Sequence, residues 1–140
     1  MPQTSYSISK IINAPISYVY KWCTDFWAED PMIIGAAYTR HIVDKSSKRA
    51  VWIQHYADKE AVRYVTLSPP DSWHMEGLND ESTRTADYHL KSLGKKTKLT
   101  ISIKIKYKTI EPEPASKLRE NLSNDWEKYK TALEKDYLSS

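Results

Sequence analysis

Four histidines are the residues of this 140-residue chain best suited to acid–base or metal chemistry. No two of them have the i, i+4 spacing of a helical metal site, and none is spaced from a cysteine as in a zinc site. Two of the four (His41, His55, His74 and His89) could converge on neighbouring strands. A catalytic function would need His74 or His55 to point inward beside Glu76, Asp87 or Arg63, where a carboxylate in an apolar pocket could act as a general acid or base. Because exposed strand histidines are the commoner case, we predict no catalytic residue and no metal site.

A run of lysines lies near the end of the chain, where residues 91–108 contain seven lysines and no acidic residue. Such a run could attract phosphate groups or an anionic membrane surface. Lys104, Lys106 and Lys108, however, alternate with apolar residues, and lysines in this phase protect a sheet from edge pairing. The net charge of +3 is also small for a nucleic-acid-binding protein. We therefore expect no nucleic-acid partner.

The single cysteine, Cys23, cannot form an internal disulfide, which is typical of a reducing compartment. The sequence has neither the apolar N-terminal segment of a signal peptide nor the ~20 apolar residues needed to span a bilayer. It also has no glycine-rich phosphate loop. We expect a cytoplasmic protein without stable membrane insertion, with one domain over residues 1–140 and no cofactor.

The elements that must position any site are predicted from hydrophobic periodicity and turn residues. Apolar residues at helical spacing follow Asn13-Ala14-Pro15 and predict a helix over 16–26. Runs rich in β-branched and aromatic residues predict strands at 5–12, 35–43, 50–57, 62–68, 72–78, 84–92 and 98–110. Strands grouped between two helices indicate an α+β fold with a curved antiparallel sheet of about six to seven strands.

The last strand and the C-terminal helix have the clearest patterns. Every odd position from residue 99 to residue 107 is apolar, which predicts one buried face formed by Leu99, Ile101, Ile103, Ile105 and Tyr107. The predicted helix over 115–138 has an apolar stripe with Leu118, Leu122, Trp126 and Tyr129. Such a helix is not stable alone, so we expect this stripe to lie against the sheet.

The inward faces of the middle strands stay open at this stage, because a shift of one residue exchanges the two faces of a strand. Strand 50–57 turns inward either Val51, Ile53 and His55 or Trp52, Gln54 and Tyr56. Strand 72–78 turns inward either Trp73, Met75 and Gly77 or Ser72, His74, Glu76 and Leu78.

A short motif precedes and begins the first predicted helix. It reads Ile12-Asn13-Ala14-Pro15-Ile16-Ser17-Tyr18-Val19-Tyr20, and Asp25-Phe26 follows it. The motif is similar to the pattern I-x-A-P-x-x-x-V-[WF], followed by D-[FW], of the START-related superfamily of helix-grip proteins. The strand at 99–107 and the helix at 115–138 also lie where that family has its last strand and its C-terminal helix. The family includes pollen-allergen-like proteins, polyketide cyclases and aromatases, coenzyme-Q-binding proteins, lipid-transport-like proteins and co-chaperones.

This resemblance implies a cavity between the sheet and the C-terminal helix that holds a lipid, isoprenoid, polyketide or other small hydrophobic or aromatic molecule. We place it between the 99–107 strand and the 115–138 helix. The expected pocket residues are Trp22, Trp73, Met75, Ile101, Ile103, Ile105, Tyr107, Leu122, Trp126 and Tyr129, with His55, His74 and Arg84 as candidate polar groups. An apolar pocket of ~300 Å³ or more would favour binding, and a filled interior would exclude it.

Two other functions stay open. In a polyketide cyclase or aromatase, Arg84 or Arg63 and a tyrosine would bind a substrate oxygen while an acid enolises the neighbouring carbon. In a protein–protein interaction module related to the co-chaperones, the exposed tyrosines and tryptophans would contact a protein partner. Strand arginines more often form ion pairs on the solvent-exposed face, so we expect a carrier rather than an enzyme.

Overall fold

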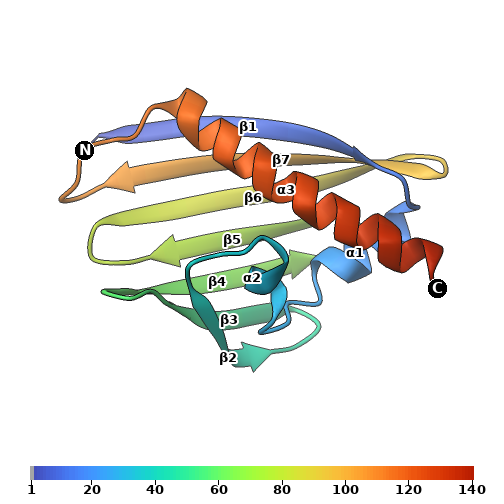
Figure 1. Ribbon diagram of the computed structural model, residues 1–140, viewed down its shortest axis with the longest axis horizontal. Coiled ribbons are helices and arrows are strands. Elements are labelled where there is room, and N and C mark those ends of the chain that lie inside the picture. The colour runs from blue at the N-terminus through green and yellow to red at the C-terminus, as the bar shows by residue number, and fades with distance from the viewer. Residues whose placement is uncertain (1) are drawn as a thin grey trace.

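The computed structural model describes residues 2–140, which form a seven-stranded antiparallel sheet and three helices (Figure 1). The strands are β1 (Gln3–Ile12), β2 (Thr39–Lys45), β3 (Arg49–His55), β4 (Glu60–Ser68), β5 (Ser72–Leu78), β6 (Ser82–Leu93) and β7 (Lys96–Tyr107), and the helices are α1 (Ile16–Cys23), α2 (Asp30–Ile33) and α3 (Ala115–Leu138). The predicted α+β architecture is confirmed.

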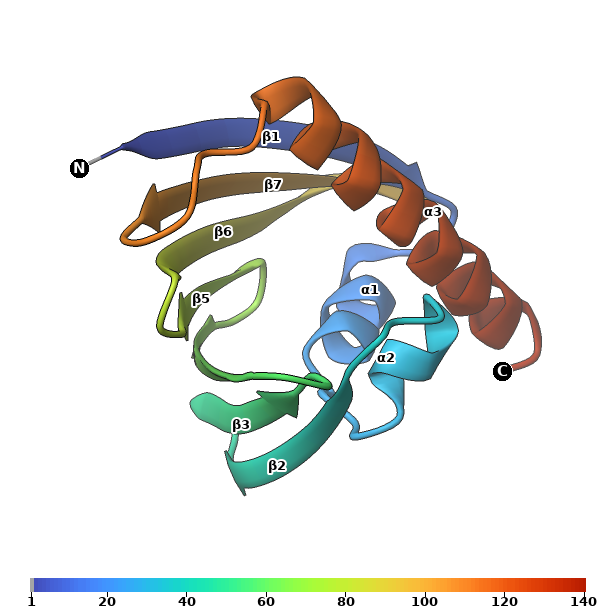
Figure 2. The same ribbon diagram turned by 60° about the vertical axis from the view of Figure 1, so that its left-hand side comes forward.

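The sheet has the strand order β1-β7-β6-β5-β4-β3-β2. Strands β2 to β7 follow one another as hairpins, and β1 pairs with β7 from Gln3 opposite Lys106 to Ile12 opposite Thr97. Figure 2 shows the sheet curling so that all three helices lie on its concave side. Two facing walls therefore enclose the interior of the molecule, one made by the sheet and one made by the helices.

The segment between α1 and β2 differs from the prediction. The helix predicted over 16–26 ends at Cys23, and Pro31 near the start of α2 begins a separate turn of helix. Phe26 and Gly35 have positive φ angles of 47° and 63°, which bend the chain on either side of α2. The strand predicted from residue 35 begins only at Thr39, so residues 34–38 form a loop.

Helix α3 crosses the sheet diagonally and lies against β1, α1 and α2 (Figure 1). Lys10 of β1 pairs with Glu127 at 3.3 Å, and Nε1 of Trp22 in α1 donates to Asp136 at 2.9 Å. The backbone N–H of Asn13 donates to Glu134 at 2.7 Å. These contacts hold the helix near the β1 edge. Among residues 2–140 there is no helix with the length and apolar content needed to cross a membrane.

The core lies between β1, β7 and the helices. The odd residues of β7 from Leu99 to Tyr107 are all buried, as their alternation predicts. They pack with Tyr6, Ile8 and Ile12 of β1 and with the fully buried Leu133 of α3. The interior is therefore tightly packed beneath the part of α3 that lies against β1.

Candidate ligand-binding site

The register of the middle strands places one set of side chains on the concave face. Gln54 is 4% exposed, whereas the neighbouring His55 is exposed. Trp73 is 3% exposed, whereas the side chain of His74 is 38% exposed. Of the two faces left open by the sequence, β3 therefore turns Trp52 and Gln54 inward, with Tyr56 just after it also lining the cavity, and β5 turns Trp73, Met75 and Gly77 inward.

A cavity of about 460 Å³ lies between this face of the sheet and the helices. Its walls come from α1, β3 to β6 and the middle of α3, and the loop after α2 completes them. Because α3 packs against the sheet mainly at β1, the space between the helix and the sheet widens towards the middle strands. The cavity occupies that wider part.

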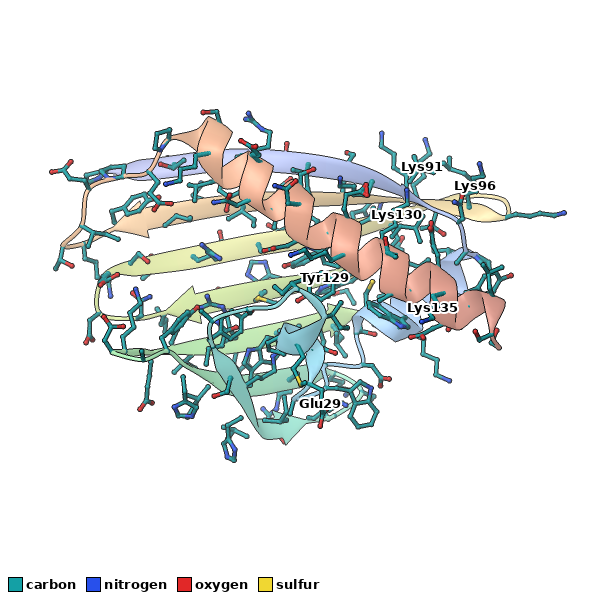
Figure 3. All side chains as sticks on the ribbon, viewed as in Figure 1. Glu29, Lys91, Lys96, Tyr129, Lys130 and Lys135 are labelled. Carbon is teal, nitrogen blue, oxygen red and sulfur yellow. The ribbon has the colours of Figure 1, made fainter. Side chains whose placement is uncertain are left out.

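Aromatic rings form much of the wall. The rings of Trp73 and Tyr88 stack with centroids 4.8 Å apart and planes 7° from parallel. The rings of Trp126 and Tyr129 on α3 lie 4.9 Å apart, and Trp126 lies 6.2 Å from Tyr88. In Figure 3, Tyr129 lies beside α3 over the middle strands. Stacked and tilted aromatic pairs provide a rigid apolar surface. This surface suits a planar or apolar molecule.

Burial keeps one thiol and two phenols of the cavity wall neutral. Burial raises the pKa of Tyr88 to about 12, and it also raises the pKa of the Tyr129 hydroxyl and of the Cys23 thiol. These groups therefore keep their protons near neutral pH and offer neither a thiolate nor a phenolate. Burial raises the pKa of Asp125 too, while Lys128 opposes that rise.

Three arginines make the cavity more polar than the sequence predicts: Arg40, Arg63 and Arg84. Nη1 of Arg40 donates to Asp30 at 3.0 Å, and its guanidinium lies 4.1 Å from the ring centroid of Trp52. Burial raises the pKa of Asp30, and Arg40 opposes that rise. Burial lowers the pKa of Arg63, and the positive charge of Arg84 lowers it further.

The loop of residues 34–38 closes one side of the cavity, with Ile34, Gly35 and Tyr38 among its lining residues. Nζ of Lys128 on α3 donates to the carbonyl of Ile34 at 3.3 Å, which ties the loop to the helix. The rings of Tyr38 and Tyr56 lie 5.1 Å apart and join the loop to the residue that follows β3. The residues that the sequence places in a strand thus form part of the wall.

A second, smaller hollow of about 190 Å³ adjoins the cavity. Both are lined by Tyr56, Arg63 and Arg84. The smaller hollow extends towards Ile105, Tyr107 and the start of α3. In the described residues no group of three or more His, Cys, Asp and Glu side chains is placed to hold a metal ion.

Known proteins share this arrangement although their sequences differ. No protein-family model matches the sequence, and no curated protein matches it either. Among solved structures, the Zhui aromatase/cyclase from Streptomyces sp. R1128 superposes with a TM-score of 0.71 at 12% identity, covering 96% of this chain and 93% of that one. Ara h 8.0201 superposes with a TM-score of 0.73 at 13% identity, covering 99% of this chain and 100% of that one. A START superfamily protein from Mycobacterium smegmatis gives 0.64 at 14% identity, covering 94% and 95%.

The chain has the helix-grip fold of the START superfamily. The fold implied by the N-terminal motif and by the order of elements is therefore confirmed. At identities of 14% or less, these likenesses describe the path of the backbone and leave the site to be argued from its own residues.

Within the helix-grip fold, the residues expected in the pocket fall into three groups. Trp22, Trp73, Met75, Arg84, Leu122, Trp126 and Tyr129 line the larger cavity. Ile105 and Tyr107 line the smaller hollow. Ile101 and Ile103 belong to the packed core and line neither of the two. The cavity thus lies further from β7 than the sequence predicts, because α3 packs closely over that side of the sheet.

The two histidines expected as polar pocket groups require a correction. His55 and His74 both lie in the outward phase of their strands, and neither lines the cavity. His55 lies 3.8 Å from Glu60 on the neighbouring strand. Since the alternation of a strand is strict, the buried Gln54 and Trp73 force both histidines onto the convex face.

Several residues of the site are missed by the sequence reasoning. Arg40 and Asp125 line the cavity and are not among the predicted residues. Trp52 enters the sequence reasoning only in one of the two possible inward faces of its strand, and Arg63 only as a catalytic alternative. The sequence does contain a pattern that would indicate a buried Arg63, because it shares a strand phase with the small apolar residues Ala61 and Val65. The opposite phase of β4 contains Val62 and Tyr64, which are exposed, so the pattern alone does not decide between the two faces.

On the convex face, His74 provides a testable pH dependence. Its Nδ1 lies 2.6 Å from Asp87, its cross-strand partner on β6. This hydrogen bond raises the pKa of His74 above its ordinary value of about 6.5. A raised folded-state pKa stabilises the fold fully below the ordinary pKa, and this contribution is lost as the pH rises through the folded-state pKa.

We expect Asp87→Asn to lower the pKa of His74 towards its ordinary value, because the hydrogen bond to the Asp87 carboxylate is the main cause of the raised pKa. An NMR titration of the His74 ring protons in the wild type and the variant measures the change. His41, on β2 at the far end of the sheet order, serves as the internal control. An unchanged His74 titration would show that Asp87 does not bind it in solution.

Proposed function

We propose that the protein binds one small hydrophobic or aromatic molecule in the cavity between the sheet and α3. The observation that carries this proposal is the cavity of about 460 Å³ with the paired rings of Trp73, Tyr88, Trp126 and Tyr129 in its wall. Ligand pockets in proteins range from about 300 to about 1,000 Å³ and are lined mainly by apolar and aromatic side chains. The volume and the wall both fit a ligand site.

The position of the cavity supports the same proposal. The interior beneath α3 near β1 is packed, where fully buried residues such as Leu99 and Leu133 fill the space. Empty volume costs stability, because the surrounding side chains lose contacts. A bound apolar molecule would restore those contacts. The likeness to an aromatase/cyclase is in keeping with a ligand of this class.

The chemistry of the wall favours binding over turnover. The Cys23 thiol and the Tyr88 and Tyr129 hydroxyls are held neutral by burial, and His55 and His74 lie outside the cavity. Asp30 is engaged by Arg40. This leaves Asp125 as the carboxylate of the wall that could abstract a proton from a substrate carbon. With that single candidate, we propose a carrier or sensor of the molecule rather than an enzyme.

Titration with N-phenylnaphthylamine, an uncharged aromatic probe that fluoresces in apolar surroundings, tests the proposal. We expect saturable binding with one probe molecule per chain. Near-ultraviolet circular dichroism recorded on the same samples verifies that the packing is native, since loosely packed states also bind such dyes. A fluorescence increase that never saturates, or none at all, would count against a ligand site.

A further inference from the structure

Arg63 and Arg84 are two cations that face the ligand cavity without an acidic partner. Arg63 is only 9% exposed, and both residues line the larger cavity and the smaller hollow. In the described part of the chain neither guanidinium lies within ion-pair distance of a carboxylate, whereas Arg40 is paired with Asp30 at 3.0 Å. Buried charges are normally paired, so this pair of arginines requires an explanation.

The register of the sheet brings the two arginines together. Arg63 of β4 lies opposite Gly77 of β5, and Gly77 lies opposite Arg84 of β6. The three residues thus form one row across the concave face. Adjacent strands are ~4.8 Å apart. The backbones of Arg63 and Arg84 are therefore two strand spacings apart, with Gly77 midway between them.

Gly77 provides the space in which the Arg63 guanidinium lies. A Cβ atom placed on Gly77 would lie 2.9 Å from Cζ of Arg63 and closer still to its Nη1. The Arg63 side chain therefore extends over Gly77, in the direction of Arg84. A larger residue at position 77 would displace it. The row Arg63-Gly77-Arg84 accordingly forms a cradle with two guanidinium groups and no side chain between them.

The electrostatics of the cradle are unfavourable in the empty protein. Burial and the nearby charge of Arg84 both lower the pKa of Arg63. The phenols of Tyr56, Tyr38 and Tyr88 oppose this lowering, but the Tyr88 hydroxyl carries no charge near neutral pH, because burial raises its pKa to about 12. A bound anion would offset both the desolvation and the repulsion, and guanidinium groups bind carboxylates through paired hydrogen bonds.

We propose that the molecule bound in the cavity carries an oxyanion, such as a carboxylate, which Arg63 and Arg84 hold where the two hollows meet. Its apolar body lies in the larger cavity against Trp73 and Trp126. This inference rests on the proposed function and narrows it to hydrophobic or aromatic acids. The arginines supply the orientation, and the aromatic wall supplies the apolar contact.

Two matched probes test the inference. Anilinonaphthalene sulfonate is N-phenylnaphthylamine with an added sulfonate, which stands in for the carboxylate. We expect the wild-type protein to bind the sulfonate at least about tenfold more tightly than the uncharged amine, because a charge-assisted hydrogen bond contributes about that factor or more. Fluorescence titrations measure both Kd values.

Arg63→Gln and Arg84→Gln test the residues, and Arg119→Gln on the exposed face of α3 is the control for the lost charge. Each cavity variant should reduce the preference for the sulfonate to about twofold or less, whereas Arg119→Gln should retain it. Arg84 is half-buried, so its variant provides a second reading if Arg63→Gln perturbs folding.

The outcomes separate the two proposals. Equal affinity of the wild type for both probes would overturn this inference alone. A preference that persists in both cavity variants would also overturn it, because the surface lysines would then account for the attraction of the sulfonate. If the two cavity variants lose affinity equally for both probes, the arginines shape the cavity and do not hold an anion. Binding of neither probe to the wild type would overturn the proposed function together with the inference.

Discussion

Replacing Met75 with tryptophan is expected to raise the Kd of N-phenylnaphthylamine at least about tenfold, which corresponds to about 1.4 kcal/mol of binding free energy. Met75 lies on the inward phase of β5 and lines the cavity. It is half-buried, and its cross-strand partner on β6 is the small Ala86. The indole of a tryptophan at position 75 is larger than the methionine side chain and extends into the larger cavity, where it occupies the volume that the probe needs.

Met32→Trp provides the matched control. Met32 lies on α2, is 78% exposed and does not line the cavity. The same replacement there should leave the Kd within about twofold, since surface substitutions rarely change more than about 0.5 kcal/mol. Met75 is also a better site for this test than Ile103, which is 5% exposed in the packed core, where tryptophan would overpack the interior. Undiminished binding by natively folded Met75→Trp would place the probe outside the cavity.

Replacing Trp52 with alanine is expected to cost about 3–5 kcal/mol of the free energy of unfolding, the range for buried Trp or Phe truncations. Trp52 is 1% exposed and packs against Phe26 with ring centroids 5.2 Å apart. Its Nε1 donates to Gln54 at 3.1 Å, and the Arg40 guanidinium lies over its ring. The truncation therefore leaves a void, removes a partner of the buried Gln54 amide and exposes a buried cation to the void.

Denaturation in guanidinium chloride, followed by far-ultraviolet circular dichroism, measures this loss. Trp27→Ala is the control, because Trp27 is 57% exposed although its Nε1 also forms a hydrogen bond, to Asp25 at 2.8 Å. We expect the control to lose about 1 kcal/mol or less. If Trp52→Ala does not fold, Trp52→Phe, which keeps most of the apolar volume, should fold with a smaller loss. Equal losses for Trp52→Ala and Trp27→Ala would contradict the packing described for Trp52.

The C-terminal elements and the middle strands illustrate how much of the fold the sequence predicts. The alternation that ends at Tyr107 and the stripe that contains Trp126 predict β7 and α3 closely, because each element has one apolar and one polar face. In β3 to β5 the pattern does not predict which face turns inward, since both phases of these strands contain apolar or aromatic residues. Val62 and Tyr64, for example, lie on the exposed face of β4.

The site was harder to predict than the fold, for reasons that its own residues illustrate. Arg63 occupies a buried position because Gly77, a strand away, leaves room for its guanidinium. This fit between Arg63 and Gly77 joins residues that are distant in sequence, so it cannot be predicted until the strand register is known. The hydrophobic pattern also does not predict the loop that contributes Tyr38, because positive φ angles at Phe26 and Gly35 define the path of the chain around it.

The most direct test of a ligand site in the cavity is the location of bound N-phenylnaphthylamine by NMR. Intermolecular nuclear Overhauser effects between the probe and the side chains of the complex report contacts within about 5 Å, roughly the spacing of paired aromatic rings. We predict effects to Met75, Trp73, Trp126 and Tyr129 and none to the exposed Met32. Effects confined to exposed side chains such as Met32, or a complex that gives none to the cavity wall, would contradict the account.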